Sequence, residues 1–157
     1  MPSTITLRSA TATDDAIIAT HFYQMWRDND VPVKAIVPNW QAEIQQYLDE
    51  ARRSLGYQAF VAEVNDQIVG SVECQRFAGL YPNILEASYR QDGYIWGVYV
   101  ESDFRRQGIA TQLTDRAIAY LRSIGCTHAV LNASPSGKSV YSRLGFADSN
   151  VVRRSLT

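Results

Sequence analysis

The second half of the chain contains the pattern that most constrains its fold, a run of strand, turn, helix and strand. Residues 93–100, GYIWGVYV, are almost continuously apolar, and a turn rich in arginine and glycine follows at residues 101–108. Apolar residues then recur at helical spacing, which predicts a helix over about 108–123. Residues 127–134 form a second apolar strand. Because buried apolar strands joined by a helix are typical of parallel pairs, this run predicts a parallel βαβ unit within a mixed sheet.

The first half of the chain predicts two helices and three strands. A short strand near residues 5–7 precedes a helix that begins in the Thr- and Asp-rich residues 11–15, and a second helix follows Pro38. The apolar segments 57–64 and 68–77 flank the turn sequence NDQ, so they predict a β-hairpin.

The remaining segments complete the predicted order. A long loop covers residues 79–93, a short helix covers 137–144, and the tail 146–156 can supply one more strand. The order is then β-α-α-β-β-β-α-β-α-β, which predicts an α/β fold with a mixed sheet. No repeat or linker divides the chain, so we expect residues 1–157 to form a single domain.

The composition narrows the classes of function. The 15 basic and 16 acidic residues give a net charge of −1, which argues against a dedicated nucleic-acid binder. No apolar run reaches the roughly 18 residues of a membrane span, and the N-terminus lacks the apolar core of a signal peptide. The isolated Cys74 and Cys126 show no metal-ligand spacing. We therefore expect a cytoplasmic protein without a metal site, a membrane partner or a nucleic-acid partner.

Two segments are candidates for binding phosphate, and the first is weak. The sequence Gly137-Lys138-Ser139 matches the end of a Walker-type loop. The first glycine of that motif is replaced by Asn132, and Pro135 removes a backbone donor. We therefore expect this segment to begin a helix rather than to bind a nucleoside triphosphate.

The second candidate is the turn Arg105–Ala110, RRQGIA, which joins a strong strand to a strong helix. A helix N-terminus presents unpaired N–H groups and the positive end of the helix dipole to an anion. Gly108 permits close approach of the backbone, and Arg105 and Arg106 add charged donors. The alternative interpretation is a solvated basic turn before a helix.

Taken together, these motifs resemble the GNAT superfamily of N-acetyltransferases. The matching segments are Val98-Tyr99-Val100 on the strand, Arg105–Ala110 in the turn and Val140–Phe146, VYSRLGF, at the expected distance. The resemblance implies acetyl-coenzyme A as co-substrate, held in a cleft between the two central parallel strands. It implies coenzyme contacts for Val98, Tyr99, Val100, Arg105, Arg106, Gln107, Gly108, Ile109, Ala110, Thr111, Asn132 and Ser134. Ser134 stands where the family often has an asparagine, which is a longer donor.

The resemblance also implies a catalytic role for Tyr141. A phenol near the sulfur of a thioester can give a proton to the departing thiolate, so Tyr141 is the expected general acid. The alternative role for Tyr141 is a core aromatic beside Phe146. Many family members carry a glutamate near the start of the central strand, but the corresponding position here is about Tyr94. Glu73, on the preceding strand, is the candidate base, and the alternative is a solvated strand residue.

The expected activity is therefore acetyl transfer to a primary amine. We expect a small-molecule acceptor, while an amino-acid-like compound and a protein amine remain alternatives, and the resemblance makes a homodimer possible. A non-catalytic acyl-coenzyme A sensor on the same fold is the alternative from a different class.

The resemblance implies that the first two helices and the loop over 79–93 frame the acceptor. The candidate specificity residues in that loop are Tyr81, Glu86, Tyr89, Arg90 and Asp92. We expect the aromatic residues of the helices to pack in the core; they are Tyr23, Trp26 and Trp40.

Overall fold

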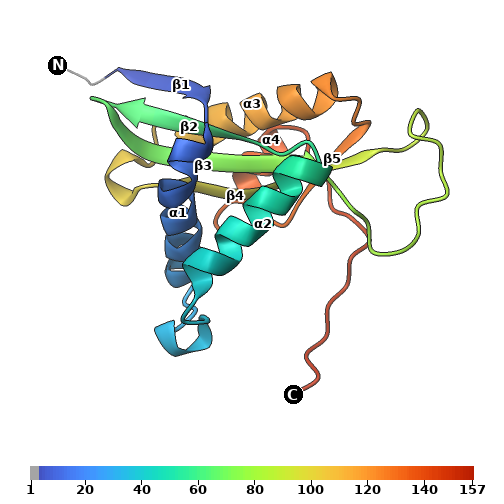
Figure 1. Cartoon of the computed structure of the whole chain (residues 1–157), viewed down its shortest axis with the longest axis horizontal. Helices are drawn as coiled ribbons and strands as arrows, with labels where there is room; N and C mark the ends of the chain where they lie inside the picture. The colour runs from blue at the N-terminus through green and yellow to red at the C-terminus, as the bar shows by residue number, and fades with distance from the viewer. Residues whose placement is uncertain (1–3) are drawn as a thin grey trace.

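A five-stranded mixed sheet forms the centre of the computed structural model, which describes residues 4–157. The strands lie side by side in chain order: β1 (Ile5–Ser9), β2 (Gln58–Val64), β3 (Gln67–Arg76), β4 (Asp92–Val100) and β5 (His128–Leu131). The first four strands pair antiparallel, whereas β4 and β5 run parallel (Figure 1). The predicted α/β class, mixed sheet and parallel βαβ unit are thus confirmed.

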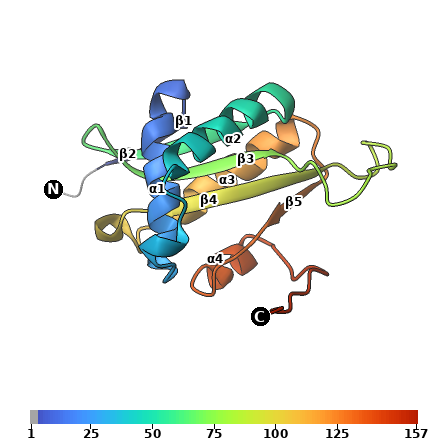
Figure 2. The ribbon, with the colours of Figure 1, turned by 60° about the horizontal axis from the view of Figure 1, so that its bottom comes forward.

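Helices cover both faces of the sheet. α1 (Asp15–Asp28) and α2 (Trp40–Ser54) pack on one face, and α3 (Ile109–Ser123), which connects β4 to β5, packs on the other (Figure 2). The short helix α4 (Lys138–Arg143) follows β5. The 3₁₀ helices are η1 (Ala12–Asp14), η2 (Val33–Ala35) and η3 (Ser102–Phe104). Within residues 4–157, no helix is both long and apolar enough to cross a membrane.

Two apolar cores hold these layers together. The larger core lies between the sheet and α3, where Leu113 and Leu121 pack against buried residues such as Val72 of β3. The smaller core lies on the other face, where Ile18 of α1 and Leu48 of α2 are almost fully buried. Because burial of apolar side chains is the dominant stabilising term in folding, these cores fix the positions of the helices that surround the site.

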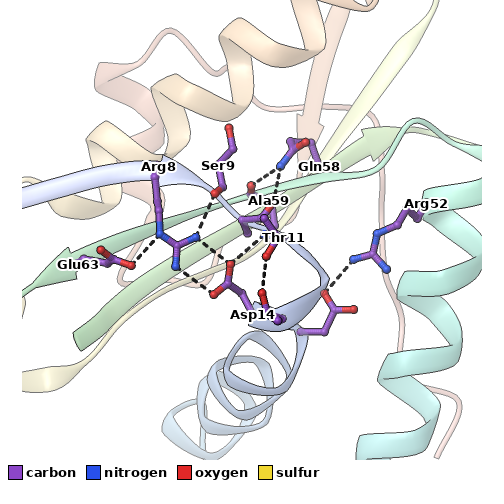
Figure 3. Close-up of polar contacts among 11 residues, drawn as sticks. Arg8, Ser9, Thr11, Asp14, Arg52, Gln58, Ala59 and Glu63 are labelled. Carbon is purple, nitrogen blue, oxygen red and sulfur yellow. Dashed lines mark hydrogen bonds and ion pairs between the residues drawn. The ribbon is translucent and has the colours of Figure 1, made fainter. Parts of the chain in front are cut away.

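Charged groups fix the start of α1 against the sheet (Figure 3). Arg8 of β1 donates to Asp14 across 2.8 Å and to Glu63 of β2 across 2.7 Å. The Arg8 guanidinium holds the pKa of Asp14 below its usual value. A second ion pair, in which Arg52 donates to Asp15 across 2.9 Å, ties α2 to the first turn of α1. The two helices on this face are therefore anchored to each other and to β1.

The tail contradicts one of the predictions. Residues 147–157 form no strand, and the chain runs away from the sheet to its C-terminus (Figure 1). The predicted strand over 146–156 is wrong because the adjacent pairs Val151-Val152 and Arg153-Arg154 do not alternate apolar and polar residues, so neither strand face would be apolar. Within the described residues, β5 is consequently an edge of the sheet.

Candidate active site

A cavity opens where the parallel pair of β4 and β5 comes apart. The pairing runs from Asp92 opposite His128 to Ile95 opposite Leu131, and β4 then continues to Val100 with only β3 as its partner. A cavity of about 740 Å³ lies at this opening, lined by residues of α1, α2, β4, α4, the segment after β5 and the tail. Its volume lies in the range of small-molecule sites. The sequence predicted a cleft at this place, between the two central parallel strands.

A β-bulge in β4 shapes the floor of the cavity. Two residues of β4, Gly97 and Val98, lie opposite the single residue Val72 of β3 because the register of the pair shifts there. Gly97 has a φ of +64°, a conformation that glycine adopts without steric cost. Both bulge residues line the cavity. The bulge therefore lies at the point where β4 loses β5 as its neighbour.

A buried carboxyl group lies beneath Gly97. Glu73 of β3 has no exposed surface, and within residues 4–157 neither of its carboxyl oxygens has a hydrogen-bond partner. A Cβ atom at position 97 would lie 2.6 Å from Glu73 Oε1, so the carboxyl group fills the space that a side chain would need. Complete burial raises the pKa of Glu73 well above its usual value, because a low-dielectric environment favours the protonated form. Glu73 is not the solvated strand residue that the sequence allowed as an alternative.

The start of α3 forms an anion site made of backbone groups. Arg106 and Gly108 have φ values of +63° and +79°, and such turns gather successive N–H groups into a concave surface. Gly108 is the N-cap of α3, no side chain caps the helix, and its first turn contains no acidic residue. Gln112 makes the bond from its N–H group to the Gly108 carbonyl, so the preceding N–H groups of the first turn face no helical acceptor. This geometry suits a phosphate or a pyrophosphate.

The side chain of Arg105 has protein partners. Its guanidinium donates to the Val100 carbonyl and to Asp28 of α1, each across 2.7 Å, and it lies 5.4 Å from the centre of the Tyr99 ring. The same contact holds the pKa of Asp28 below its usual value. Arg105 therefore joins α1 to the turn before α3, a contact that the sequence did not predict.

The structure places the residues expected at the site in different positions along β4, α3 and α4. Four of them line the cavity, namely Val98, Asn132, Ser134 and Tyr141. Tyr99 and Val100 are buried on β4 next to it, and Ile109 is buried at the start of α3. The segment 105–111 forms the turn and the first residues of α3. The structure thus brings the four lining residues together at the opening and places the segment 105–111 at the start of α3, beyond the end of β4.

Tyr141 lies on α4, and the segment that resembled a phosphate loop begins this helix. Gly137 is the N-cap of α4, so the expectation that Gly137-Lys138-Ser139 starts a helix is confirmed. The Tyr141 ring packs edge-to-face against Phe146, with 6.0 Å between the ring centres, and it also lines the cavity. Burial raises the pKa of Tyr141, so its phenol keeps its proton at neutral pH. Tyr141 therefore offers an O–H donor to whatever occupies the cavity.

A side-chain hydrogen bond joins β4 to the residue that follows β5. Asn132, the residue after β5, donates from its side-chain amide to the Tyr94 hydroxyl of β4 across 2.7 Å. Both residues line the cavity. This bond joins the two strands at the point where their backbone pairing ends.

The expectation that the aromatic residues of the helices pack in the core is correct for two of them and wrong for the third. Tyr23 and Trp40 stack on each other with 4.5 Å between ring centres, so they join α1 to α2 as packing residues. Trp26, however, is 45% exposed and lines the cavity together with Phe22 of α1 and Tyr47 of α2. Helical spacing shows which residues share a face, but it does not show which part of that face meets a cavity.

The long loop between β3 and β4 does not frame this cavity. It leaves the body of the domain as an extended excursion (Figure 1), and its exposed residues include Tyr81 and Tyr89. Arg90 of the loop donates to Asp92 at the start of β4 across 3.3 Å. Among the described residues that line the cavity, none comes from the loop, so the expected specificity role of its residues finds no support in the geometry.

The sequence was compared with models of known protein families to identify the class of protein to which this fold and site belong. The family model of the acetyltransferase (GNAT) family matches residues 12–146. The chain therefore belongs to the acetyltransferase (GNAT) family, in agreement with the resemblance of its motifs.

Individual relatives support the same family. The chain is 35% identical over 97 residues to an uncharacterized N-acetyltransferase of Methanocaldococcus jannaschii. The aligned region covers 60% of this chain and 41% of the relative. It is 31% identical over 91 residues to N-alpha-acetyltransferase 30 of Schizosaccharomyces pombe, and the aligned region covers 56% of each chain. The chain thus matches about half of the length of these curated relatives.

A solved structure shows the same fold over the whole chain. A predicted acetyltransferase of Clostridium acetobutylicum, solved with acetyl-CoA, superposes on this chain with a TM-score of 0.82 at 22% sequence identity. The superposition covers 98% of this chain and 97% of that one. At this level of identity the likeness establishes the fold.

Replacement of Gly97 by alanine is expected to destabilise the protein much more than the same change at Gly125. Both glycines have positive φ values, +64° and +88°, so both variants carry a backbone strain of about 1 kcal/mol. At position 97 the new Cβ also meets a carboxyl oxygen at 2.6 Å, whereas at position 125 nothing lies within 4 Å. We expect Gly97→Ala to lose about 2 kcal/mol more than Gly125→Ala in urea unfolding followed by circular dichroism. Equal losses in the two variants would contradict the position of the Glu73 carboxyl group.

Proposed function

We propose that this protein is an acetyl-coenzyme A-dependent N-acetyltransferase that acetylates a primary amine of a small molecule. The observation that carries this proposal is the separation of β4 from β5 after Ile95 and Leu131. It creates a single cavity that contains the free edge of β4, the Tyr141 phenol and the side chains of α1 and α2. A thioester donor, a general acid and an amine acceptor can therefore meet in one space.

The residues present fit coenzyme A at two places. Coenzyme A carries a pyrophosphate, and the turn 105–111 offers it unpaired N–H groups at the positive end of α3, with Arg106 as an additional cation. It also carries an extended pantetheine arm, and β4 beyond Ile95 offers it an edge without a strand partner, where the Val100 carbonyl already accepts from Arg105. Asn132 and Ser134 line the opposite side of the opening. Bound acetyl-coenzyme A would supply the reactive thioester.

Tyr141 is the proposed general acid. In the reaction a C–N bond forms to the acceptor and the C–S bond of the thioester breaks, so the departing sulfur needs a proton or a hydrogen bond. The raised pKa of Tyr141 keeps its phenol protonated at neutral pH, which is the state that an acid requires. The position of Tyr141 in the cavity lining supports this role.

Glu73 is the proposed base for the amine. Its raised pKa brings the carboxyl group closer to the pKa of an amine, which makes the ionised group a stronger base than an exposed glutamate. Gly97 is the residue of the cavity floor that lies against this carboxyl group, and it has no side chain to separate the two. A nearby ammonium group favours the ionised form of a carboxyl group. Glu73 must release its own proton to solvent before it can take one from the acceptor, and the charge of the entering ammonium group favours that release.

The acceptor space favours a small molecule. The cavity of about 740 Å³ must hold both the end of the pantetheine arm and the acceptor, which leaves room for a compact amine. A protein α-amine is the second candidate, because one relative of this chain is named N-alpha-acetyltransferase 30.

Removal of the Tyr141 hydroxyl is expected to impair turnover without impairing coenzyme binding. We expect Tyr141→Phe to lower kcat by about 10²-fold, since general acid catalysis typically contributes at least this much. The measurement is release of free coenzyme A thiol from acetyl-coenzyme A with a panel of primary amines, alongside calorimetric binding of coenzyme A.

The matched control is Tyr89→Phe, which removes the same hydroxyl from a residue that is 74% exposed in the β3–β4 loop. This control should keep wild-type turnover. Undiminished turnover in Tyr141→Phe would show that the thiolate is protonated by another group. Tight coenzyme binding with no turnover on any amine would instead indicate the acyl-coenzyme A sensor.

Replacement of Glu73 by glutamine is expected to change both activity and the pH dependence of stability. Because the folded state raises the pKa of Glu73 above its unfolded value, the wild type gains stability relative to Glu73→Gln as the pH falls from 7 towards 5. We expect kcat/KM to fall by at least about 10²-fold at pH 7 and to recover at high pH, where the free amine needs no base. A loss of activity that is constant with pH would assign Glu73 a structural role instead.

A further inference from the structure

Four aromatic rings from three elements line the α1–α2 side of the cavity. They form a chain of edge-to-face contacts that runs from Trp26 to Phe22 (6.1 Å between ring centres), from Phe22 to Trp96 (5.2 Å) and from Trp96 to Tyr47 (5.4 Å). We call these four residues the aromatic wall. All four line the cavity, although α1, α2 and β4 are distant from one another in the sequence.

A buried glutamine holds the central part of the aromatic wall in place. The Trp96 indole N–H donates to the side-chain oxygen of Gln75 across 2.9 Å, and the Gln75 amide donates to the Tyr47 hydroxyl across 2.7 Å. Gln75 itself is only 3% exposed. The polar atoms of both rings are thus bonded to the protein, and the rings meet the cavity with their apolar surfaces. Such a preformed surface binds a flat apolar group without first having to order its side chains.

The charges at the cavity are few. Among the described lining residues, the only acidic one is Glu43 of α2, and the only basic one is Arg153 of the tail. Glu43 is exposed and accepts a hydrogen bond from Asn39 across 3.0 Å. One carboxylate matches one ammonium group, whereas an acceptor with several ammonium groups would leave all but one without a partner. A single arginine, Arg153 of the tail, likewise offers little to a phosphorylated acceptor.

We propose that the acceptor is a monoamine whose body is an aromatic ring or a similarly flat apolar group, bound against the aromatic wall. This inference rests on the proposed function. Aromatic groups pack favourably against the edges and faces of other rings, and an ammonium group is attracted to ring faces before it loses its proton. The wall therefore selects for the apolar body of the acceptor, while its single amine is the group that is acetylated.

Acceptor preference tests this inference directly. The assay is thiol release from acetyl-coenzyme A with 2-phenylethylamine, n-butylamine, spermidine, kanamycin and a short peptide that begins with Met-Leu. We expect kcat/KM for 2-phenylethylamine to exceed that for n-butylamine by at least about tenfold, because the buried phenyl ring adds apolar contact area. A preference for spermidine, kanamycin or the peptide would overturn the inference while the N-acetyltransferase activity itself would stand.

Variants of the wall separate recognition from a general loss of structure. We expect Trp96→Leu to raise KM for 2-phenylethylamine by about tenfold with little change for n-butylamine. Trp26→Leu, at a residue that is 45% exposed, should act in the same direction and serves if Trp96→Leu does not fold. The matched control is Trp40→Leu, because Trp40 stacks on Tyr23 and does not line the cavity. If Trp40→Leu altered the preference as much as the wall variants, the inference would be wrong.

Calorimetric titration distinguishes failure of the inference from failure of the proposed function. 2-Phenylethylamine is titrated into the protein saturated with coenzyme A, which cannot react. Binding that is weakened about tenfold by Trp96→Leu or Trp26→Leu supports the aromatic wall as the amine site, even if no amine is acetylated. Absence of binding, or binding that the wall variants leave unchanged, overturns the inference whatever the activity.

Discussion

The end of the parallel pairing between β4 and β5 is the constraint on which the whole site depends. Up to Ile95 and Leu131 the two strands satisfy each other's backbone groups, and beyond this point β4 continues with β3 as its only partner. An interior strand with one free edge is an unusual feature, because unpaired backbone groups favour the addition of another extended segment. The bulge at Gly97 lies at the start of this free edge and leaves room for the carboxyl group of Glu73 beneath it.

Polar contacts connect the two ends of the site. Arg105, in the turn before α3, donates to Asp28 at the end of α1. Within the same region His21 of α1 is bonded to Ser71 of β3 across 2.8 Å and to Glu101 across 3.2 Å. Desolvation lowers the pKa of the buried His21, which favours its neutral form. The helix that carries two rings of the aromatic wall is therefore fixed to the turn that is proposed to bind the coenzyme.

Most of the fold could be predicted from local patterns in the sequence. The apolar strand at 93–100, the helix that follows it and the second apolar strand predict a parallel pair, because apolar strands joined by a helix are typical of such pairs. Gly108 and Gly125 marked the two ends of α3, and both have the positive φ values that favour glycine. The prediction of a strand in the tail was wrong, because the apolar and polar residues of the tail do not alternate.

The site was only partly predictable, since contacts between distant segments leave no local signal. Tyr141 and the turn 105–110 could be found because their motifs are contiguous. The burial of Glu73 could not be found, since it results from the packing of α1 and α2 over β3 and from the absence of a side chain at Gly97. The aromatic wall was missed for the same reason, because residues such as Phe22 and Trp96 meet only in the folded chain.

Amide hydrogen exchange with and without acetyl-coenzyme A tests the central claim most directly. If the coenzyme lies along the free edge of β4 and on the start of α3, residues 98–100 and 107–111 should become protected together when it binds. Protection confined to the segment 137–139, or no change along β4, would contradict the account, because the separation of β4 from β5 would then not be the binding site.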